Sequence, residues 1–281
     1  MKRLFLSLLT MVAVAACASP LAKAETPEQA LAGAAQRASQ LHSAKFDMQA
    51  TVNMTFPPQM GQIFGQTGSS TGSMTVAVTG NGEAQFPDRY HATMNVKMGG
   101  LSLATEVVVA NGKAYVKNPL TQKWEASTQS GSLTDQLGQP DPLSYDQFLK
   151  NVKSVKDLGD TTLGGASVHH YRLTPDKDKL IASLNRLGKN PQAAAAMKQV
   201  LDSGTMAIEV WFGKDDHLVR RMNVNLDYNI DLNQLMGSLG TSAGASGSRL
   251  PAGSTIHASA QVVINYHDFD APVTISVPPV S

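Results

Sequence analysis

Apolar and polar residues alternate along several long segments of this chain. From Phe46 to Phe56 each even-numbered residue is apolar, and each residue between them is polar. A period of two is typical of a β-strand with one buried face. The pattern returns in residues 74–86, 90–98, 101–109, 206–212, 222–230 and 256–266, with shorter strand-like segments at 113–117, 154–158, 168–173 and 273–277. We therefore expect about ten or eleven strands.

A second group of segments has helical spacing. Thr26 is expected to cap a helix over residues 27–42, because it precedes a proline at the first helical position. Asp176 to Lys179 are expected to start another helix with solvated charges. The further predicted helices are Pro142–Lys153, Asp176–Leu187 and a segment capped by Asn190-Pro191, while residues 57–73 and 237–254 are predicted loops. No strand–helix–strand rhythm is present, so the strands are expected to be antiparallel.

The fold class that accommodates this order is α+β. We expect one strongly curved antiparallel sheet, a half-barrel, with the helices covering its concave face. Three or four modest helices would cover so many one-sided strands incompletely, which leaves room for a cavity. The residues predicted to line it are Phe46, Met48, Val52, Met54, Met74, Val76, Met94, Val96, Leu103, Val107, Met206, Ile208, Val210, Met222, Val224 and Leu226.

The beginning of the chain is typical of a bacterial lipoprotein signal. Lys2 and Arg3 precede an apolar run that ends at Ala16, and Cys17, the only cysteine, follows it. This run is too short to span a membrane. We expect a signal over residues 1–16, acylation of Cys17, a tether over 17–26 and a single lipid-binding domain over 27–281. Cleavage after Ala24 is the alternative, and it would give a secreted protein without an anchor.

Charge and composition narrow the function classes. The net charge is +1, and it becomes −1 when Lys2 and Arg3 are removed with the signal. A chain so close to neutral has no electrostatic footprint for nucleic acid. Ten of its 12 methionines follow Cys17, and the flexible thioether adapts to irregular apolar partners. Each single methionine is nevertheless more often a filler of an ordinary core.

Three segments resemble a known family. They are the Asn-Gly hairpin in Glu106–Val116 with the following Trp124, the strand–turn–strand segment Val210–Met222 and the terminal segment Tyr266–Ile275. With the Cys17 signal, they are similar to motifs of the LppX/LprA/LprF/LprG lipoproteins. The resemblance implies the half-barrel fold of the bacterial lipoprotein carrier of the outer-membrane sorting pathway, enclosing acyl chains.

Apparent catalytic and metal sites are weak. Ser242 lies in a Gly-x-Ser-x-Gly pattern, but a nucleophile elbow needs a strand before it and a helix after it, and this one lies in a Gly/Ser linker. His169 and His170 are neighbours in a strand, so their side chains are expected on opposite faces, each with a structural role. We expect no enzyme activity, no metal and no cofactor.

The sequence thus predicts a cell-envelope lipoprotein that binds or transfers lipids. Its expected partners are a lipid or lipid-linked ligand, the membrane through its N-terminal acyl anchor, and another envelope transport protein, with no nucleic acid. The alternative is an adaptor or sensory module of the same fold that binds no ligand. The nature of the lipid is left open.

Overall fold

The computed structural model describes residues 25–57, 72–126, 151–188, 191–234 and 254–280. Cys17, Ser242, the predicted tether before Glu25 and most of the predicted helix at 142–153 lie outside this range. The helices are α1 (Pro27–Ala38), α5 (Lys177–Gly188) and α6 (Pro191–Asp202). The strands are β1 (Ser43–Thr55), β2 (Ser73–Gln85), β3 (Arg89–Met98), β4 (Leu101–Ala110), β5 (Lys113–Lys117), β6 (Trp124–Ala126), β7 (Val152–Leu163), β8 (Ala166–Pro175), β9 (Gly204–Gly213), β10 (Val219–Asp231) and β11 (Thr255–His267).

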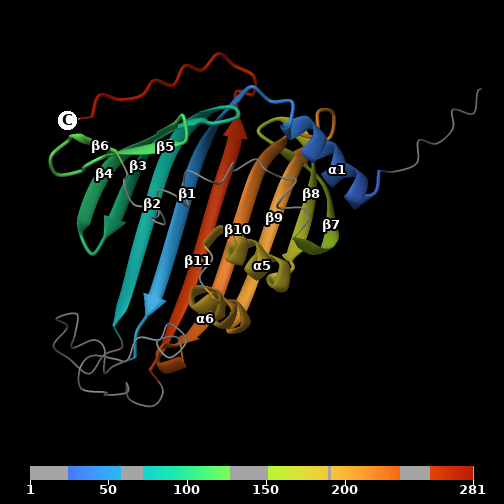
Figure 1. Cartoon of the computed structure of the whole chain (residues 1–281). Coiled ribbons are helices and arrows are strands. Elements are labelled where there is room, and N and C mark those ends of the chain that lie inside the picture. Colours follow the sequence, from blue (N-terminus) through green and yellow to red (C-terminus); the bar gives the residue numbers. More distant parts are fainter. Residues whose placement is uncertain (1–24, 58–71, 127–150, 189–190, 235–253, 281) are drawn as a thin grey trace, which may run out of the picture.

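All these strands form one curled, open antiparallel sheet of 11 strands, as predicted. Its order is β6-β5-β4-β3-β2-β1-β11-β10-β9-β8-β7 (Figure 1). Strands β1 to β6 follow one another as a meander, and β7 to β11 do the same. The pairing of β1 with β11 is therefore the one place where strands distant in sequence meet.

Two tight turns explain the register between β3 and β4 and between β4 and β5. Asn111 and Gly112 have φ angles of 54° and 70°, and Gly99 and Gly100 have 54° and 87°. Two successive positive φ angles match the twist of the flanking strands in a two-residue hairpin, and Asn and Gly adopt them most readily. The hairpin expected at Asn111-Gly112 is confirmed, and Gly99-Gly100 forms a second two-residue hairpin between β3 and β4.

Helix α1 has the predicted start. The Thr26 hydroxyl accepts a hydrogen bond from the Gln29 backbone N–H, and the Gln29 side chain accepts one from the Thr26 N–H. The helix ends at Ala38 rather than at residue 42. Its apolar side packs into the main core, whose buried residues are Ala30, Leu31, Ala34, Leu41, Tyr171, Leu173, Ile208, Val210, Phe212, Leu218, Val219 and Tyr266.

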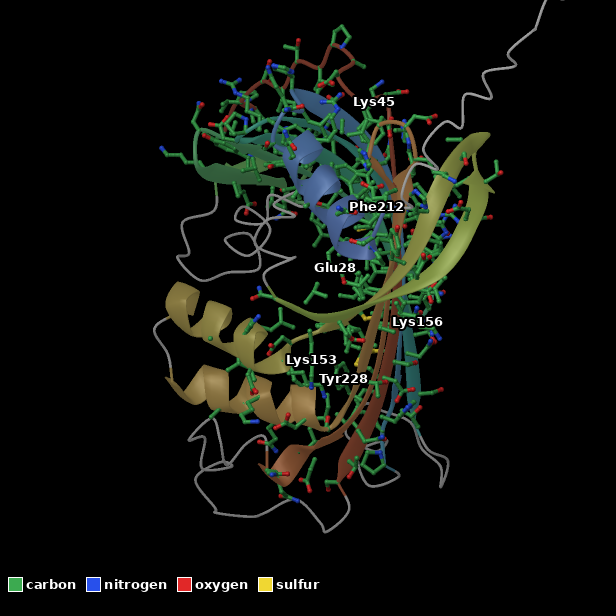
Figure 2. All side chains as sticks on the ribbon, turned by 90° about the vertical axis from the view of Figure 1, so that its right-hand side faces the viewer. Glu28, Lys45, Lys153, Lys156, Phe212 and Tyr228 are labelled. Atoms are coloured by element: carbon green, nitrogen blue, oxygen red, sulfur yellow. The ribbon has the colours of Figure 1, made fainter. Side chains whose placement is uncertain are left out.

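Helices α5 and α6 lie on the same side of the sheet as α1 (Figures 1 and 2). Asp176 accepts a hydrogen bond from the Lys179 N–H, so it caps α5 as predicted. Lys177 was predicted to be solvated, and this is wrong. Its ammonium group donates hydrogen bonds to the carbonyls of Leu201 and Gly204. A cation at the carboxyl end of α6 stabilises the helix dipole and joins the two helices.

Two other expectations are also wrong. Val152 and Lys153, predicted as the end of a helix, begin β7. Residues 273–277 form no strand. This segment instead crosses the outer face, where Ile275 is buried in a small cluster with β4 and β5. The Arg89 guanidinium donates a hydrogen bond of 2.9 Å to the Ile275 carbonyl.

Asp270 connects the end of α1 to the chain that leaves β11. Its carboxylate accepts hydrogen bonds from the His42 backbone N–H at 2.8 Å and from the Arg37 guanidinium at 2.9 Å. Its own N–H donates to the Ser43 carbonyl at 2.9 Å. The hydrogen bond from the His42 backbone, followed by the Arg37 guanidinium, outweighs burial and lowers the pKa of Asp270.

We predict that Asp270→Asn lowers the melting temperature at neutral pH. A carboxyl group whose pKa is lowered by folding stabilises the protein above its unfolded pKa of about 3.9, and this contribution is lost as the pH falls through the folded pKa. The difference between the variant and the unmodified chain should therefore shrink in acid. Thermal unfolding from neutral pH downward measures it, with Asp88→Asn, an exposed aspartate, as the control. If Asp270→Asn lowered the melting temperature by the same amount at all pH values, this role of the Asp270 carboxylate would be contradicted.

Candidate functional site

One face of the sheet carries the apolar side chains of nearly every strand. In antiparallel sheets, residues directly opposite each other point to the same face. One such row crosses the sheet from β4 to β8 in register. Its members are Leu103, Val96, Val78, Ala50, Val262, Val224, Ile208 and Leu173. The same pairings place all the predicted lining residues on this face, here called the inner face.

The opposite face is polar over the central strands. In β1 the outward residues are Asp47, Gln49, Thr51 and Asn53, which are exposed. A slip of one residue in register would exchange the two faces, so this contrast strongly specifies the pairing. The sheet thus separates a wet outer face from an apolar inner face.

The helices cover only part of the inner face. Ile208 and Val210 are 4% and 1% exposed, and they lie in the core cluster with α1. Val107 belongs to a second small cluster with Val109 and Ala114. The other predicted lining residues that pack against the main core are Phe46, Met206, Met222 and Val224. These positions act as ordinary core rather than as free surface.

The remaining predicted residues form what we call the open apolar face. They are Met48, Val52, Met54, Met74, Val76, Met94, Val96, Leu103 and Leu226, of which Met94 also packs against the Val107 cluster. Eight of them are half-buried, and Leu103 is 39% exposed. In the part of the chain that the structure describes, the helices lie over the β7–β10 side of the sheet, away from β2–β4 (Figure 1). The predicted lining therefore divides into a packed half and a half that solvent reaches.

The predicted lining left out the residues of β11, the strand beside β1 on this face, although a strand over residues 256–266 was predicted. Ala258 and Ala260 of β11 lie between Met54 and Val52 of β1 on one side and β10 on the other. Their alternation was visible, but the pairing of the first strand with the last was not. The side chain of alanine is a single methyl group, so the layer of apolar side chains on the inner face is thinnest along this part of β11.

A glycine also shapes the face. Gly82 lies opposite Phe46, and a Cβ atom there would overlap the Phe46 ring. The ring therefore lies flat across β2, where an alanine would displace it. An inward glycine within an alternating strand is the signal that identifies such a position from sequence.

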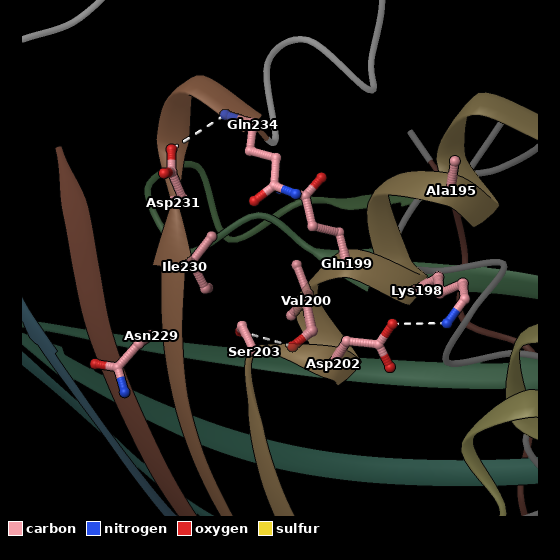
Figure 3. A pocket seen from close by; sticks show the side chains of 10 residues that line it. All are labelled: Ala195, Lys198, Gln199, Val200, Asp202, Ser203, Asn229, Ile230, Asp231 and Gln234. Atoms are coloured by element: carbon pink, nitrogen blue, oxygen red, sulfur yellow. Dashed lines mark hydrogen bonds and ion pairs between the residues drawn. The ribbon is translucent and has the colours of Figure 1, made fainter. Parts of the chain in front are cut away.

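A separate pocket of about 610 Å³ lies beside α6 and the end of β10 (Figure 3). It is lined by Ala195, Lys198, Gln199, Val200, Asp202, Ser203, Asn229, Ile230, Asp231 and Gln234, none of which was predicted. Its charged groups are engaged locally. Lys198 pairs with Asp202 at 2.6 Å, and Asp231 caps the backbone of Gln234 at 3.1 Å. We give this mixed polar pocket no role in function.

The two adjacent histidines have structural partners. His169 Nδ1 lies 2.6 Å from Asp160, and His170 Nε2 lies 3.1 Å from Glu209. The His170 ring also stacks on Trp211 at 4.1 Å between centroids. Among the described residues, no group of three or more His, Cys, Asp or Glu side chains is placed to hold a metal ion. A helix long and apolar enough to cross a membrane is likewise not found among them.

Among known proteins, solved structures are the ones found to be similar to this chain. No family model and no curated protein matches the chain. LprF from Mycobacterium bovis is 18% identical, with 90% of this chain and 98% of LprF covered and a TM-score of 0.45. The Mycobacterium tuberculosis lipoprotein LppX is 14% identical, with 89% and 100% covered and a TM-score of 0.43. A LolA superfamily protein from Nitrosomonas europaea is 10% identical, with 89% and 94% covered and a TM-score of 0.26.

The lipoproteins that the sequence motifs resemble are thus among the solved structures similar to this chain. Because the identities are low and the TM-scores lie below 0.5, what this chain binds has to be argued from its own residues.

Proposed function

We propose that this protein is a cell-envelope carrier that binds lipid acyl chains on its open apolar face and performs no chemistry. The observation that carries the proposal is the extent of that face. It crosses β1 to β4 in register and reaches Leu226 of β10 across Ala260 of β11, and its side chains remain partly open to solvent.

The energetics favour an apolar occupant. Contiguous exposed apolar surface is rare on monomeric proteins and marks binding sites. An acyl chain that left water for this face would gain about 0.8 kcal/mol per buried methylene. The methionines Met48, Met54, Met74 and Met94 suit such a flexible occupant, because their unbranched side chains change rotamer to follow its shape.

A matched pair of substitutions on β1 tests this proposal. Val52 and Thr51 are neighbours on opposite faces. Val52→Trp should weaken binding of a fluorescent fatty-acyl probe about tenfold, because the indole occupies space that the chain needs, and it should change stability little. Thr51→Trp should change neither. Val210→Trp, in the packed core, should cost roughly 1–3 kcal/mol of stability.

Probe titration and thermal unfolding on each variant make the measurement. If the unmodified chain bound no probe, or if Thr51→Trp weakened binding as much as Val52→Trp, the proposal would fail. The adaptor or sensory module without a ligand would then remain.

We also propose that Cys17 carries the lipid anchor, because a charged start, a short apolar run and small residues precede it. The sulfur would be the only attachment atom, so Cys17→Ser should move the protein from the membrane fraction to the soluble fraction of the cell. Detergent phase partitioning of both forms makes the same comparison in vitro. A Cys17→Ser protein that still fractionates with membranes would refute the anchor.

A further inference from the structure

Tyr228 of β10 has a buried hydroxyl group that binds none of the described residues. Tyr228 is 6% exposed, and its hydroxyl oxygen has no hydrogen-bond partner among the described residues. Burying a hydroxyl without a partner is costly, so such groups in folded proteins are usually satisfied by protein or water. Burial raises the pKa of Tyr228 above its ordinary value, so the group keeps its proton. It is a hydrogen-bond donor at any physiological pH.

The register places this side chain on the inner face. Tyr228 lies opposite Gly204 of β9 and Ala258 of β11, and Ala258 in turn lies opposite Met54. Met54 is paired with Met74, so one row joins Tyr228 to the open apolar face. Three strand spacings separate Tyr228 from Met74, which is roughly 14 Å.

Small residues flank the ring in this row. Ala258 is the small residue between Tyr228 and Met54, on the side of the open apolar face. On the other side the ring lies over Gly204, where a Cβ atom would overlap it. Figure 2 shows Tyr228 beside α6, on the helix side of the sheet. An acyl chain along this row would lie over Met74, Met54 and Ala258 and end at the hydroxyl.

We infer that the Tyr228 hydroxyl donates a hydrogen bond to the ester carbonyl of a lipid whose acyl chain lies on the open apolar face. This inference rests on the proposed function and names the group that positions the ligand there.

The surroundings favour a neutral acceptor over a phosphate. Among the described residues, the cation Lys177 lies beside this end of β9, and its ammonium group already donates to the carbonyls of Leu201 and Gly204. Burying a phosphate without a free cation would be unfavourable, whereas a carbonyl oxygen needs only one donor.

Two probes that differ in one carbonyl test the inference. Hexadecanoylglycerol has an ester carbonyl, and hexadecylglycerol is its ether counterpart with the same chain length and headgroup. The unmodified chain should bind the ester about tenfold more tightly, a difference of about 1.4 kcal/mol. In Tyr228→Phe the preference should disappear through weaker binding of the ester, with binding of the ether unchanged. Tyr115→Phe, on the outer face, is the control and should keep the preference.

Thermal unfolding of the ligand-free protein gives a second, independent readout. Tyr228→Phe removes a buried unsatisfied hydroxyl and keeps the ring, so the melting temperature should stay the same or rise. A clear fall would mean that the hydroxyl has a partner within the protein, and it would overturn the inference.

The outcomes separate this inference from the proposed function. Equal binding of ester and ether by the unmodified chain, or a preference that survives in Tyr228→Phe, would overturn the role of Tyr228 and leave acyl-chain binding intact. Absence of binding for both probes would remove the proposed function, and the role of Tyr228 with it.

Discussion

The pairing of β1 with β11 is the contact on which the rest of the structure depends. Each half of the sheet consists of strands that follow one another in sequence, with α5 and α6 between β8 and β9 in the second half. In-register pairing from Lys45 opposite His267 to Thr55 opposite His257 aligns the apolar rows of the two halves. The core under α1 and the open apolar face then become parts of one continuous surface. A slip of one residue here would turn one half of the apolar surface toward water.

The local structure followed from the sequence because its causes are local. Strict alternation identified β1, the Asn111-Gly112 dipeptide identified a hairpin, and Thr26 with Pro27 identified the start of α1. The inward set of side chains also followed, since a period of two assigns faces. Errors appeared where tertiary contacts decide. Residues 273–277 have the composition of a strand, but Ile275 instead packs on the outer face against β4 and β5.

The distinction between packed and open positions could not be predicted. Val210 and Val52 occupy equivalent places in an alternating pattern, yet one is fully buried and the other is half-buried. The difference comes from where α1 lies, and α1 is held there by Asp270, more than 200 residues away in sequence. Ala258 and Tyr228 were missed for the same reason, because their importance depends on which strands are neighbours.

The packed half of the inner face supplies the stability that lets the other half remain available. Tyr171, Phe212 and Val210 are almost fully buried, while the methionines of β1 to β3 keep partial contact with solvent. Such a division suits a carrier, since ligand release must not unfold the protein. In a purely structural core, Met48, Val52 and Val76 would not remain half-buried in register, and the Tyr228 hydroxyl would not be buried without a partner among the described residues.

The most direct measurement is mass spectrometry of the lipids that an organic solvent extracts from protein purified from its own cells. A covalent anchor stays with the polypeptide in this extraction, so any lipid recovered was bound non-covalently. The account predicts a stoichiometric lipid that contains an acyl ester. Protein that is repeatedly recovered without any lipid would contradict it.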